Sequence, residues 1–237
     1  TVFMPTDTDV YRPRNDPPRV LVLSSSPRRN GNSRVLAESL AEGAGEAGSA
    51  VELVHLPEVV REGLRDCREC RGPNGECTID DGYRELFLDK ALAADALVYA
   101  TPLWWYGLSG HLKNFLDRMF CYISEGCPEA GRVMNQLVGK RAALVISAEE
   151  SNLSARLAVV HQMQETCRYL HHTLVGIVVG TGNTRGEVRD DPTEPLVWAR
   201  ELGQRLFLIR TTDYQLDSDR AAAVWGGSER PPPGHWR

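Results

Sequence analysis

The chain has 237 residues, a formal net charge of −5 at pH 7, a pI near 5.7 and six cysteines. Its length suits a single sizeable core, its acidic balance disfavours nucleic acid or an anionic membrane as a partner, and its cysteines are too few for a disulfide scaffold. No apolar run approaches the ~18 residues needed to cross a bilayer, and no signal-peptide pattern opens the sequence, so we expect a cytoplasmic protein without a membrane partner.

Prolines gather at the two ends of the chain. Four precede residue 19, and the C-terminal end carries Pro231-Pro-Pro-Gly-His-Trp-Arg237. Such segments rarely bury enough apolar surface to fold. We therefore expect an extended tail at residues 1–18, one domain at residues 19–212 and a second tail at residues 213–237.

Apolar runs and helix-length amphipathic stretches alternate along the middle of the chain. The runs predict buried strands at residues 19–23, 50–55, 95–100, 141–147 and 173–179. The stretches predict helices at residues 33–47, about 80–93, 111–122, 154–169 and 195–208. This order predicts an α/β fold, a doubly wound five-stranded parallel sheet with helices on both faces. Ligands bind at the carboxyl ends of such strands, so the loops after the first, third and fourth strands are expected to form one site.

The loop after the first strand is rich in hydroxyl groups and leads directly into a helix. The free N–H groups and the dipole of a helix N-terminus favour an anion there. The loop has neither the Gly-x-Gly-x-x-Gly of dinucleotide-binding proteins nor the phosphate loop of NTPases, so a mononucleotide phosphate fits best. The candidate phosphate ligands are Ser24, Ser26, Arg28, Asn32 and Ser33.

Three consecutive aromatic residues follow the third strand, in Thr101-Pro-Leu-Trp-Trp-Tyr-Gly-Leu-Ser-Gly110. One such residue alone is more often a lid or an interface aromatic. Beside a phosphate loop, the pattern favours a flat ring instead. An isoalloxazine ring needs one apolar wall and backbone donors at its polar edge, which a loop with Pro and Gly can supply.

With both loops considered, the chain resembles the NADPH-dependent FMN reductase family of flavodoxin-like proteins, including its iron–sulfur flavoprotein branch. The resemblance spans residues 19–208. It rests on Ser26-Pro-Arg-Arg-Asn-Gly-Asn-Ser33, on Cys67-x2-Cys70 with Cys77 and Asp80-Asp81, and on Thr101–Gly110 followed by Leu112-Lys-Asn-Phe-Leu-Asp-Arg118.

This resemblance implies FMN as cofactor and NAD(P)H as electron donor, with the FMN phosphate held in the first loop. It implies that the flavin edge lies on Pro102, Leu103, Trp104, Trp105, Tyr106 and Gly107, and that Ser147 and Glu149 close another side. Lys113, Asp117 and Arg118 match a family helix and are interpreted mainly as structural or interfacial.

The cysteines depart from the iron–sulfur branch, which binds its cluster through a compact run of four. Here only Cys67, Cys70 and Cys77 are present in the segment, and Cys121 or Cys127 would supply a fourth thiolate only by folding back. A four-iron cluster or a zinc site normally takes four ligands, so no metal site is assigned. The cysteines are interpreted as metal-free loop residues, with a redox-active Cys67–Cys70 pair or a cluster as alternatives.

The resemblance implies that the flavin N5 carries the hydride, so no catalytic side chain is assigned. We expect an NAD(P)H oxidoreductase that passes electrons to a quinone, a flavin or another aromatic acceptor. The alternatives are a specialised flavin-dependent reductase or oxidase of one metabolite and a non-enzymatic flavodoxin-type carrier. The exposed aromatics and the apolar face of residues 112–119 predict a homodimer or a higher homo-oligomer.

Overall fold

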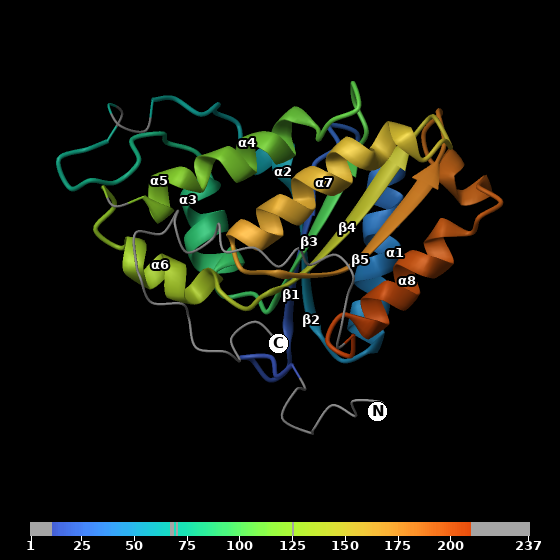
Figure 1. The fold of residues 1–237 in the computed structure, drawn as a ribbon, viewed down its shortest axis with the longest axis horizontal. Helices are drawn as coiled ribbons and strands as arrows, with labels where there is room; N and C mark the ends of the chain where they lie inside the picture. The colour runs from blue at the N-terminus through green and yellow to red at the C-terminus, as the bar shows by residue number, and fades with distance from the viewer. Residues whose placement is uncertain (1–10, 67–68, 70, 125, 210–237) are drawn as a thin grey trace, which may run out of the picture.

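Five parallel strands form one sheet in the computed structural model, which describes residues 11–66, 69, 71–124 and 126–209. The order across the sheet is β2-β1-β3-β4-β5 (Figure 1). The strands are β1 (Arg19–Ser24), β2 (Ala50–His55), β3 (Ala96–Pro102), β4 (Arg141–Ala148) and β5 (Thr173–Thr181). This confirms the predicted α/β, doubly wound fold. The order reverses between β1 and β3, so the loops after these two strands open at the switch point.

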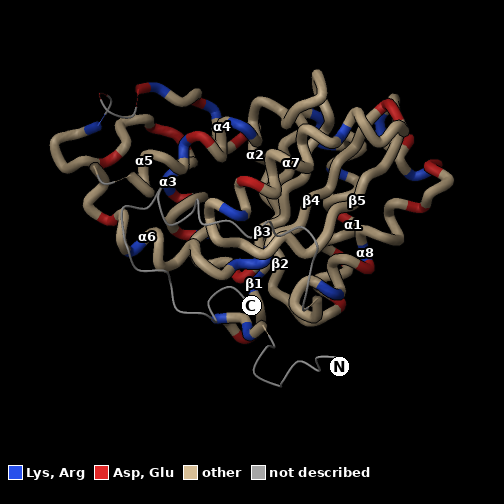
Figure 2. Tube along the Cα trace, in the orientation of Figure 1, with Lys and Arg blue, Asp and Glu red and all other residues tan. Residues whose placement is uncertain are grey.

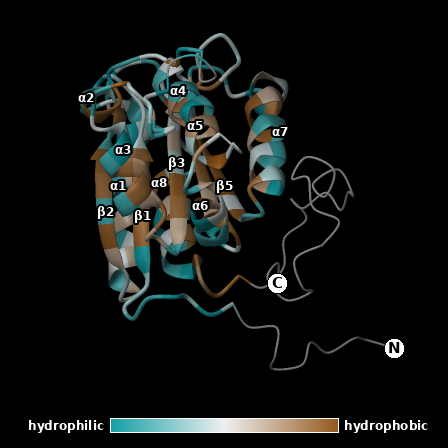
Figure 3. Cartoon of the chain, turned by 90° about the vertical axis from the view of Figure 1, so that its left-hand side faces the viewer, coloured by the Kyte–Doolittle hydropathy of each residue, from teal (hydrophilic) through white to brown (hydrophobic). Residues whose placement is uncertain are grey.

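Helices cover both faces of the sheet, as predicted. One face carries α1 (Asn32–Glu46) and α8 (Pro195–Arg205), and the other carries α4 (Gly110–Arg118) and α7 (Ser154–Tyr169) (Figure 1). The alternation of side chains along β1 explains this division. Val20 and Val22 pack in the α1 and α8 core, whereas Leu21 and Leu23 join the core under α4 and α7. Figure 3 shows the hydrophobic strands enclosed between the helical layers.

The shorter helices differ more from the expectations. The predicted helix at about 80–93 is a short turn, α3 (Tyr83–Glu85), followed by a π-helical segment, η2 (Leu86–Ala91). The predicted helix 111–122 ends at Arg118 and resumes as α5 (Phe120–Ile123), because the Met119 N–H bonds to the Leu116 carbonyl three residues back. The described residues also contain three helices that were not predicted: α2 (Leu56–Val59), α6 (Ala130–Leu137) and η3 (Glu187–Asp190).

The two helices on the α1 face approach each other closely through a pair of glycines. A Cβ atom on Gly43 would collide with the Arg200 carbonyl, and one on Gly203 would collide with the Leu40 carbonyl. The missing side chains let the two backbones touch. This close packing fixes the position of α1, whose N-terminus borders the loop after β1.

The described part of the N-terminal segment, residues 11–18, is bound across the amino edge of the sheet. Three donors converge on the carboxylate of Asp95: the Arg14 N–H at 2.6 Å, the Asn15 side-chain amide at 2.8 Å and the Arg19 N–H at 2.8 Å. The Arg14 guanidinium also donates to the Val138 carbonyl after α6, at 2.6 Å. We call residues 11–18 the N-terminal strap.

Charged residues of both signs are scattered along the described trace (Figure 2). They form eleven ion pairs among the described residues, most of them exposed. None of the helices in this part of the chain is both long and apolar enough to span a membrane.

Candidate functional site

The loop after β1 forms a narrow cradle at the N-terminus of α1. The Ser26 hydroxyl accepts a hydrogen bond from the Arg28 N–H at 3.1 Å, and the Gly31 N–H donates to the Arg28 carbonyl at 3.1 Å. A Cβ atom on Gly31 would lie only 2.8 Å from the Ser26 Oγ, so the turn closes tightly only with glycine there. The loop therefore curves around the first turn of the helix.

The helix end that faces this cradle has unsatisfied donors. No side chain of the described residues caps α1 at its N-terminus, and its first turn holds no acidic residue. The N–H groups of Asn32 and Ser33 make no hydrogen bond to any other described residue. Four N–H groups at a helix start normally find a cap, water or a ligand, so this end is open for an anion.

Two predicted phosphate ligands, Ser24 and Ser33, place buried hydroxyl groups beside the same helix end. Both side chains are inaccessible to solvent, and neither hydroxyl has a hydrogen-bond partner among the described residues. Buried hydroxyl groups are nearly always paired in folded proteins, because an unpaired one costs about 1–3 kcal/mol. Their missing partner is consistent with a ligand that bears hydrogen-bonding oxygens.

The two remaining predicted ligands of this loop differ in their surroundings. The Asn32 side chain is occupied by the loop after β5: its amide donates to the carbonyls of Gly182 and Thr184, each at 2.9 Å, and its oxygen accepts from the Val188 N–H at 3.3 Å. Arg28 is exposed at the rim of the cradle. Asn32 thus ties two loops together through its side chain and offers the cradle its backbone N–H.

The aromatic loop after β3 forms a tight hairpin tip, which projects as the green loop at the top of Figure 1. Trp104 and Gly107 exchange backbone hydrogen bonds of 3.2 and 3.0 Å, and the two residues between them have positive φ angles, 48° at Trp105 and 59° at Tyr106. This left-handed pair matches the type I′ turn, which Asn and Gly normally occupy. Bulky residues in this conformation are strained, and such strain concentrates at functional sites.

The hairpin displays its aromatic rings to solvent. Trp105 is 97% exposed, Tyr106 52% and Trp104 42%. The backbone N–H groups of Trp105 and Tyr106 make no hydrogen bond to other described residues. The tip thus combines exposed apolar rings with two free backbone donors.

The end of β4 and the loop after it each contact the aromatic loop once. The Leu103 N–H donates to the Ser147 carbonyl at 2.8 Å, and the Tyr106 hydroxyl donates to Glu150 at 3.2 Å. This hydrogen bond to Glu150 raises the pKa of Tyr106. Glu149, the predicted residue of this loop, is exposed and makes no such contact. The structure thus brings Ser147 to the aromatic loop, and Glu150 rather than Glu149 reaches the tip.

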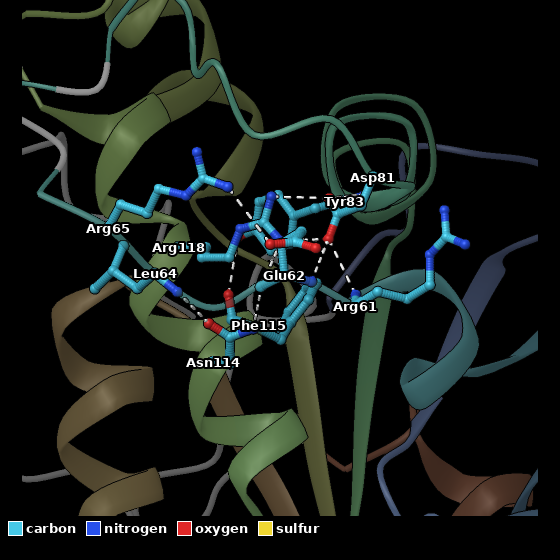
Figure 4. Close-up of polar contacts among 9 residues, drawn as sticks. All are labelled: Arg61, Glu62, Leu64, Arg65, Asp81, Tyr83, Asn114, Phe115 and Arg118. Atoms are coloured by element: carbon cyan, nitrogen blue, oxygen red, sulfur yellow. Dashed lines mark hydrogen bonds and ion pairs between the residues drawn. The ribbon is translucent and has the colours of Figure 1, made fainter.

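A buried ion pair anchors the C-terminal end of α4 (Figure 4). The Arg118 guanidinium donates to both carboxylate oxygens of Asp81, at 2.7 and 2.9 Å, and lies 4.3 Å from the centre of the Tyr83 ring. The side chains of Asp81 and Arg118 are 0% and 2% exposed. Burial alone would raise the pKa of Asp81, but hydrogen bonds from Arg118 and from backbone N–H groups hold it below the ordinary value. Arg118 is therefore structural, as interpreted from the sequence.

The same cluster holds the chain that leads toward the cysteines. Asp81 also accepts hydrogen bonds from the backbone N–H groups of Arg61 and Glu62, at 3.0 and 3.1 Å. Asn114 on α4 accepts from the Leu64 N–H at 2.9 Å and donates to the Glu62 carbonyl at 2.8 Å (Figure 4). Residues 61–64 are thereby fixed along α4.

The structure tests the predictions about the cysteines only in part, because Cys67 and Cys70 lie outside the described residues. The backbone near Cys77 does fold against the chain near Cys121: the Arg71 guanidinium donates to the Gly75 carbonyl at 2.6 Å and to the Cys121 carbonyl at 2.9 Å. Among the described residues, no group of three or more His, Cys, Asp or Glu side chains has the arrangement of a metal site. The roles of Cys67, Cys70 and Cys77 stay predictions.

A groove of about 560 Å³ opens between α4 and α7. Apolar residues of both helices and of α5 line it, and Phe120 is 46% exposed there. Lys113 and Asp117, which pair along α4 at 2.7 Å, lie on its rim. None of the residues predicted to bind a cofactor lines this groove, so we separate it from the cradle and the hairpin.

Comparison with known proteins places this arrangement in a family. The family model described as NADPH-dependent FMN reductase matches residues 18–185. Among curated proteins, the chain is 25% identical over 173 residues to the putative NAD(P)H-dependent FMN-containing oxidoreductase YwqN of Bacillus subtilis, covering 73% of this chain and 90% of the relative. It is 26% identical over 204 residues to an iron-sulfur flavoprotein of Archaeoglobus fulgidus, covering 82% of this chain and 81% of the relative.

Solved structures agree on the fold. An NAD(P)H:quinone oxidoreductase from Methanothermobacter marburgensis superposes with a TM-score of 0.60 at 23% identity, covering 79% of this chain and 95% of the other. The family match includes both the cradle and the hairpin, the two loops at which unsatisfied backbone donors gather.

Proposed function

This chain belongs to the NADPH-dependent FMN reductase family, and from that premise we propose that it passes electrons from NAD(P)H through FMN to a quinone, a free flavin or another small aromatic acceptor. The observation that carries the proposal is that the loops after the neighbouring strands β1 and β3 both hold unsatisfied hydrogen-bond donors. The donors after β1 suit a phosphate, and those after β3 suit the edge of a ring. Bound there, FMN supplies a ring that accepts hydride from a nicotinamide and passes electrons onward.

The cradle after β1 fits the phosphate of FMN. The uncapped start of α1 supplies backbone N–H groups, and the unpartnered hydroxyls of Ser24 and Ser33 supply further donors. Ser26 lines the turn that Gly31 closes, and exposed Arg28 provides a positive charge at the rim. Charge-assisted hydrogen bonds of this kind are roughly twice as strong as neutral ones.

The hairpin fits the polar edge and one face of the ring. The free N–H groups of Trp105 and Tyr106 are donors of the kind that the carbonyl oxygens and N5 of a flavin accept. The contact of Leu103 with Ser147 holds the hairpin against β4, and the Tyr106–Glu150 hydrogen bond steadies its tip. These residues bind and orient, and none of them needs to transfer a proton.

The exposure of the hairpin supports a small, planar acceptor. Trp105 is almost fully exposed, so the region beside the tip is open to molecules that approach from solvent. A flat aromatic acceptor can stack against an indole ring with a gain of about 0.5–1.5 kcal/mol beyond simple burial.

The first test is spectroscopic. The purified full-length chain is incubated with FMN, freed of excess FMN and titrated with NADPH without oxygen. We expect a bound flavin spectrum that bleaches with NADPH and returns when a simple quinone is added. A protein that retains no FMN would contradict the assignment of the cradle. A protein whose flavin bleaches but is not reoxidised by quinones or free flavins would contradict the acceptor class.

We also propose that the chain forms a homodimer through the face that contains the α4–α7 groove. Phe120 at 46% and Leu157 at 50% exposure lie on this side, and an apolar face of this kind is usually covered in solution. Replacing Phe120 with Asp is expected to shift the sedimentation behaviour from dimer to monomer. A monomer already in the parent protein would contradict the proposal.

We also propose that the protein is located in the cytoplasm. Cys77, Cys127 and Cys167 carry free thiols. Burial raises the pKa of Cys167 to about 12, so this thiol is inert. Unpaired thiols of this kind are typical of a reducing compartment.

A further inference from the structure

Three hydroxyl groups that the sequence analysis did not single out lie beneath the cradle and the hairpin. Ser25 directly follows β1, Thr101 lies near the end of β3, and Ser109 is the N-cap residue of α4. All three residues are 0% exposed. They come from three different elements, so they meet only in the folded chain.

Each of these hydroxyl groups has a defined donor role. The Ser109 hydroxyl donates to the Ser25 hydroxyl at 2.7 Å, and the Ser25 hydroxyl donates to the Ala100 carbonyl at 2.7 Å. The Thr101 hydroxyl accepts from the Ser109 N–H at 3.0 Å and donates to the Pro102 carbonyl at 2.9 Å. Every hydroxyl hydrogen therefore has an acceptor, and the network needs no water.

This hydroxyl network is the polar link between the two candidate binding loops. Ser25 stands between Ser24 and Ser26 of the cradle, and its N–H also donates to the Ala100 carbonyl at 3.0 Å. Ser109 closes the aromatic loop and accepts from the Leu112 N–H at 3.4 Å as the cap of α4. Displacing either loop alone would leave buried donors without acceptors, which is unfavourable in a dry interior. The two loops are thus held to one relative position.

We propose that Ser25, Thr101 and Ser109 are positioning residues that couple the cradle to the aromatic hairpin, so that a phosphate in the cradle raises the affinity of the hairpin for a flavin ring. The proposal rests on the FMN site proposed above. A phosphate binds best to the loop position in which the start of α1, Ser24 and Ser33 converge, and the hydroxyl network ties that position to the hairpin. When the first ligand has ordered one loop, less conformational entropy of the protein is lost when the second ligand binds.

The coupling is measured with riboflavin, which carries the flavin ring without a phosphate. Apoprotein is titrated with riboflavin in the presence and absence of saturating inorganic phosphate, and flavin fluorescence reports binding. In the parent protein, phosphate is expected to raise riboflavin affinity by about five- to tenfold, the equivalent of one well-placed hydrogen bond. No turnover is needed, so the readout is independent of activity.

The variants separate coupling from stability. Thr101→Val keeps the side-chain shape but removes the acceptor of the Ser109 N–H, and we expect it to abolish the phosphate effect. Thr101→Ser keeps the hydroxyl and is expected to restore it. Ser39→Ala is the matched control, because Ser39 on α1 also donates to a carbonyl, that of Leu196 at 2.7 Å, but on the α8 side of the helix. It is expected to lower stability while keeping the phosphate effect.

The outcomes distinguish the coupling from the site itself. If Thr101→Val does not fold, Ser25→Ala replaces it in the test, because it removes the Ser109–Ser25 hydrogen bond that joins the hairpin side to the cradle side. An unchanged phosphate effect in the variant, or FMN binding by a parent protein that shows no phosphate effect, would overturn the coupling but not the FMN site. A parent protein that binds neither FMN nor riboflavin would overturn the proposed function itself.

Discussion

At the scale of single residues, the cradle and the hairpin show two different ways to offer donors to a ligand. Within the part of the chain that the structure describes, the buried hydroxyls of Ser24 and Ser33 have no hydrogen-bond partner. Trp105 and Tyr106 adopt left-handed backbone, and their N–H groups bond to no other described residue. Both arrangements are unfavourable in the folded protein when no ligand is bound. A ligand that satisfies them recovers part of that free energy on binding.

Arg28 tests the electrostatic part of the phosphate site. Replacing Arg28 with Ala removes a charge-assisted contact worth about 1.5–3 kcal/mol, so the FMN dissociation constant is expected to rise about 10- to 100-fold. Flavin fluorescence titration measures it. The control is Arg29→Ala, because Arg29 is paired with Glu58 on the surface. Equal affinities of the Arg28 variant and the parent would remove Arg28 from the site.

Trp105 allows strain and binding to be separated. Glycine adopts a positive φ without strain, so Trp105→Gly is expected to leave the free energy of unfolding of the apoprotein unchanged or raise it by up to about 1 kcal/mol. The same variant is expected to retain FMN less tightly, because the aromatic wall is gone. Denaturant titration and FMN titration measure the two effects. A variant that loses stability and keeps full FMN affinity would contradict this account of the hairpin.

Sequence patterns reveal residue types in loops but not which neighbour points inward. The hydroxyl- and glycine-rich loop predicted a cradle at the start of a helix, and the helix does start there at Asn32. Ser25 was not among the predicted residues, because its contact with Ser109, 84 residues further along the chain, exists only in the folded protein. Glu149 and Glu150 are likewise adjacent, and only the hydrogen bond to Tyr106 distinguishes them.

At the scale of elements, α4 is the part that connects the site to the rest of the molecule. Its first residues close the aromatic loop, and its last residue, Arg118, is buried against Asp81. Asn114, one turn earlier, holds residues 62 and 64. The segment before Asp81 is therefore joined by hydrogen bonds to the helix that follows the hairpin.

The Asp81–Arg118 pair is expected to be essential for stability. Asp81→Asn leaves the Arg118 charge buried without its counter-ion, and breaking a buried pair in this way costs about 3–5 kcal/mol. Urea denaturation at neutral pH measures the loss. Glu129→Gln breaks the exposed pair with Arg132 and is expected to change stability by at most about 1 kcal/mol. Similar small losses in both variants would show that the cluster in Figure 4 is not the anchor.

The long elements were predictable because burial imposes a clear period on them. All eight residues of β4 are buried, and five of them, residues 142–146, form a continuous apolar run. The helix α7 was predicted with its observed bounds. The short elements were not. In α6 only Val133 and Leu137 are buried, so one turn of apolar spacing is too little to reveal a helix. The π-helical stretch η2 has no distinct sequence pattern at all.

At the scale of the whole molecule, the two edges of the sheet have opposite roles. The carboxyl edge carries exposed loops with free donors, and the amino edge is closed by the N-terminal strap. Beneath the strap, Lys140 is 1% exposed and donates to the carbonyls of Leu92 and Ala94. Burial lowers the pKa of Lys140 to about 7. His172, 3% exposed, lies near it and bonds to the Leu137 carbonyl at 2.9 Å.

His172 makes the stability of the fold sensitive to acid. Burial, with a smaller effect from Lys140, lowers the pKa of His172 from 6.5 to about 3. Between these values the unfolded chain binds a proton that the folded chain does not, so stability falls as the pH is lowered from about 6.5 toward 3. Glutamine does not titrate. Between pH 7 and pH 4, the free energy of unfolding of His172→Gln is therefore expected to fall by about 1–3 kcal/mol less than that of the parent. Urea midpoints at the two pH values measure the difference.

If the His172→Gln variant lost as much free energy of unfolding between pH 7 and pH 4 as the parent, groups other than His172 would be responsible for the acid sensitivity of the fold.

The N-terminal strap also has a consequence for the order of events during synthesis. Arg14 leaves the ribosome early, yet its guanidinium bonds to Val138, which is 124 residues further along the chain. At about 5–20 residues per second, the strap waits on the order of ten seconds for its partner to be translated. β4 and β5 follow Val138 in the chain, so this contact becomes possible while the last two strands are still to be made. A contact over so long a stretch of chain forms after the more local contacts, and we expect residues 11–18 to slow the loss of the native state more than they speed its formation.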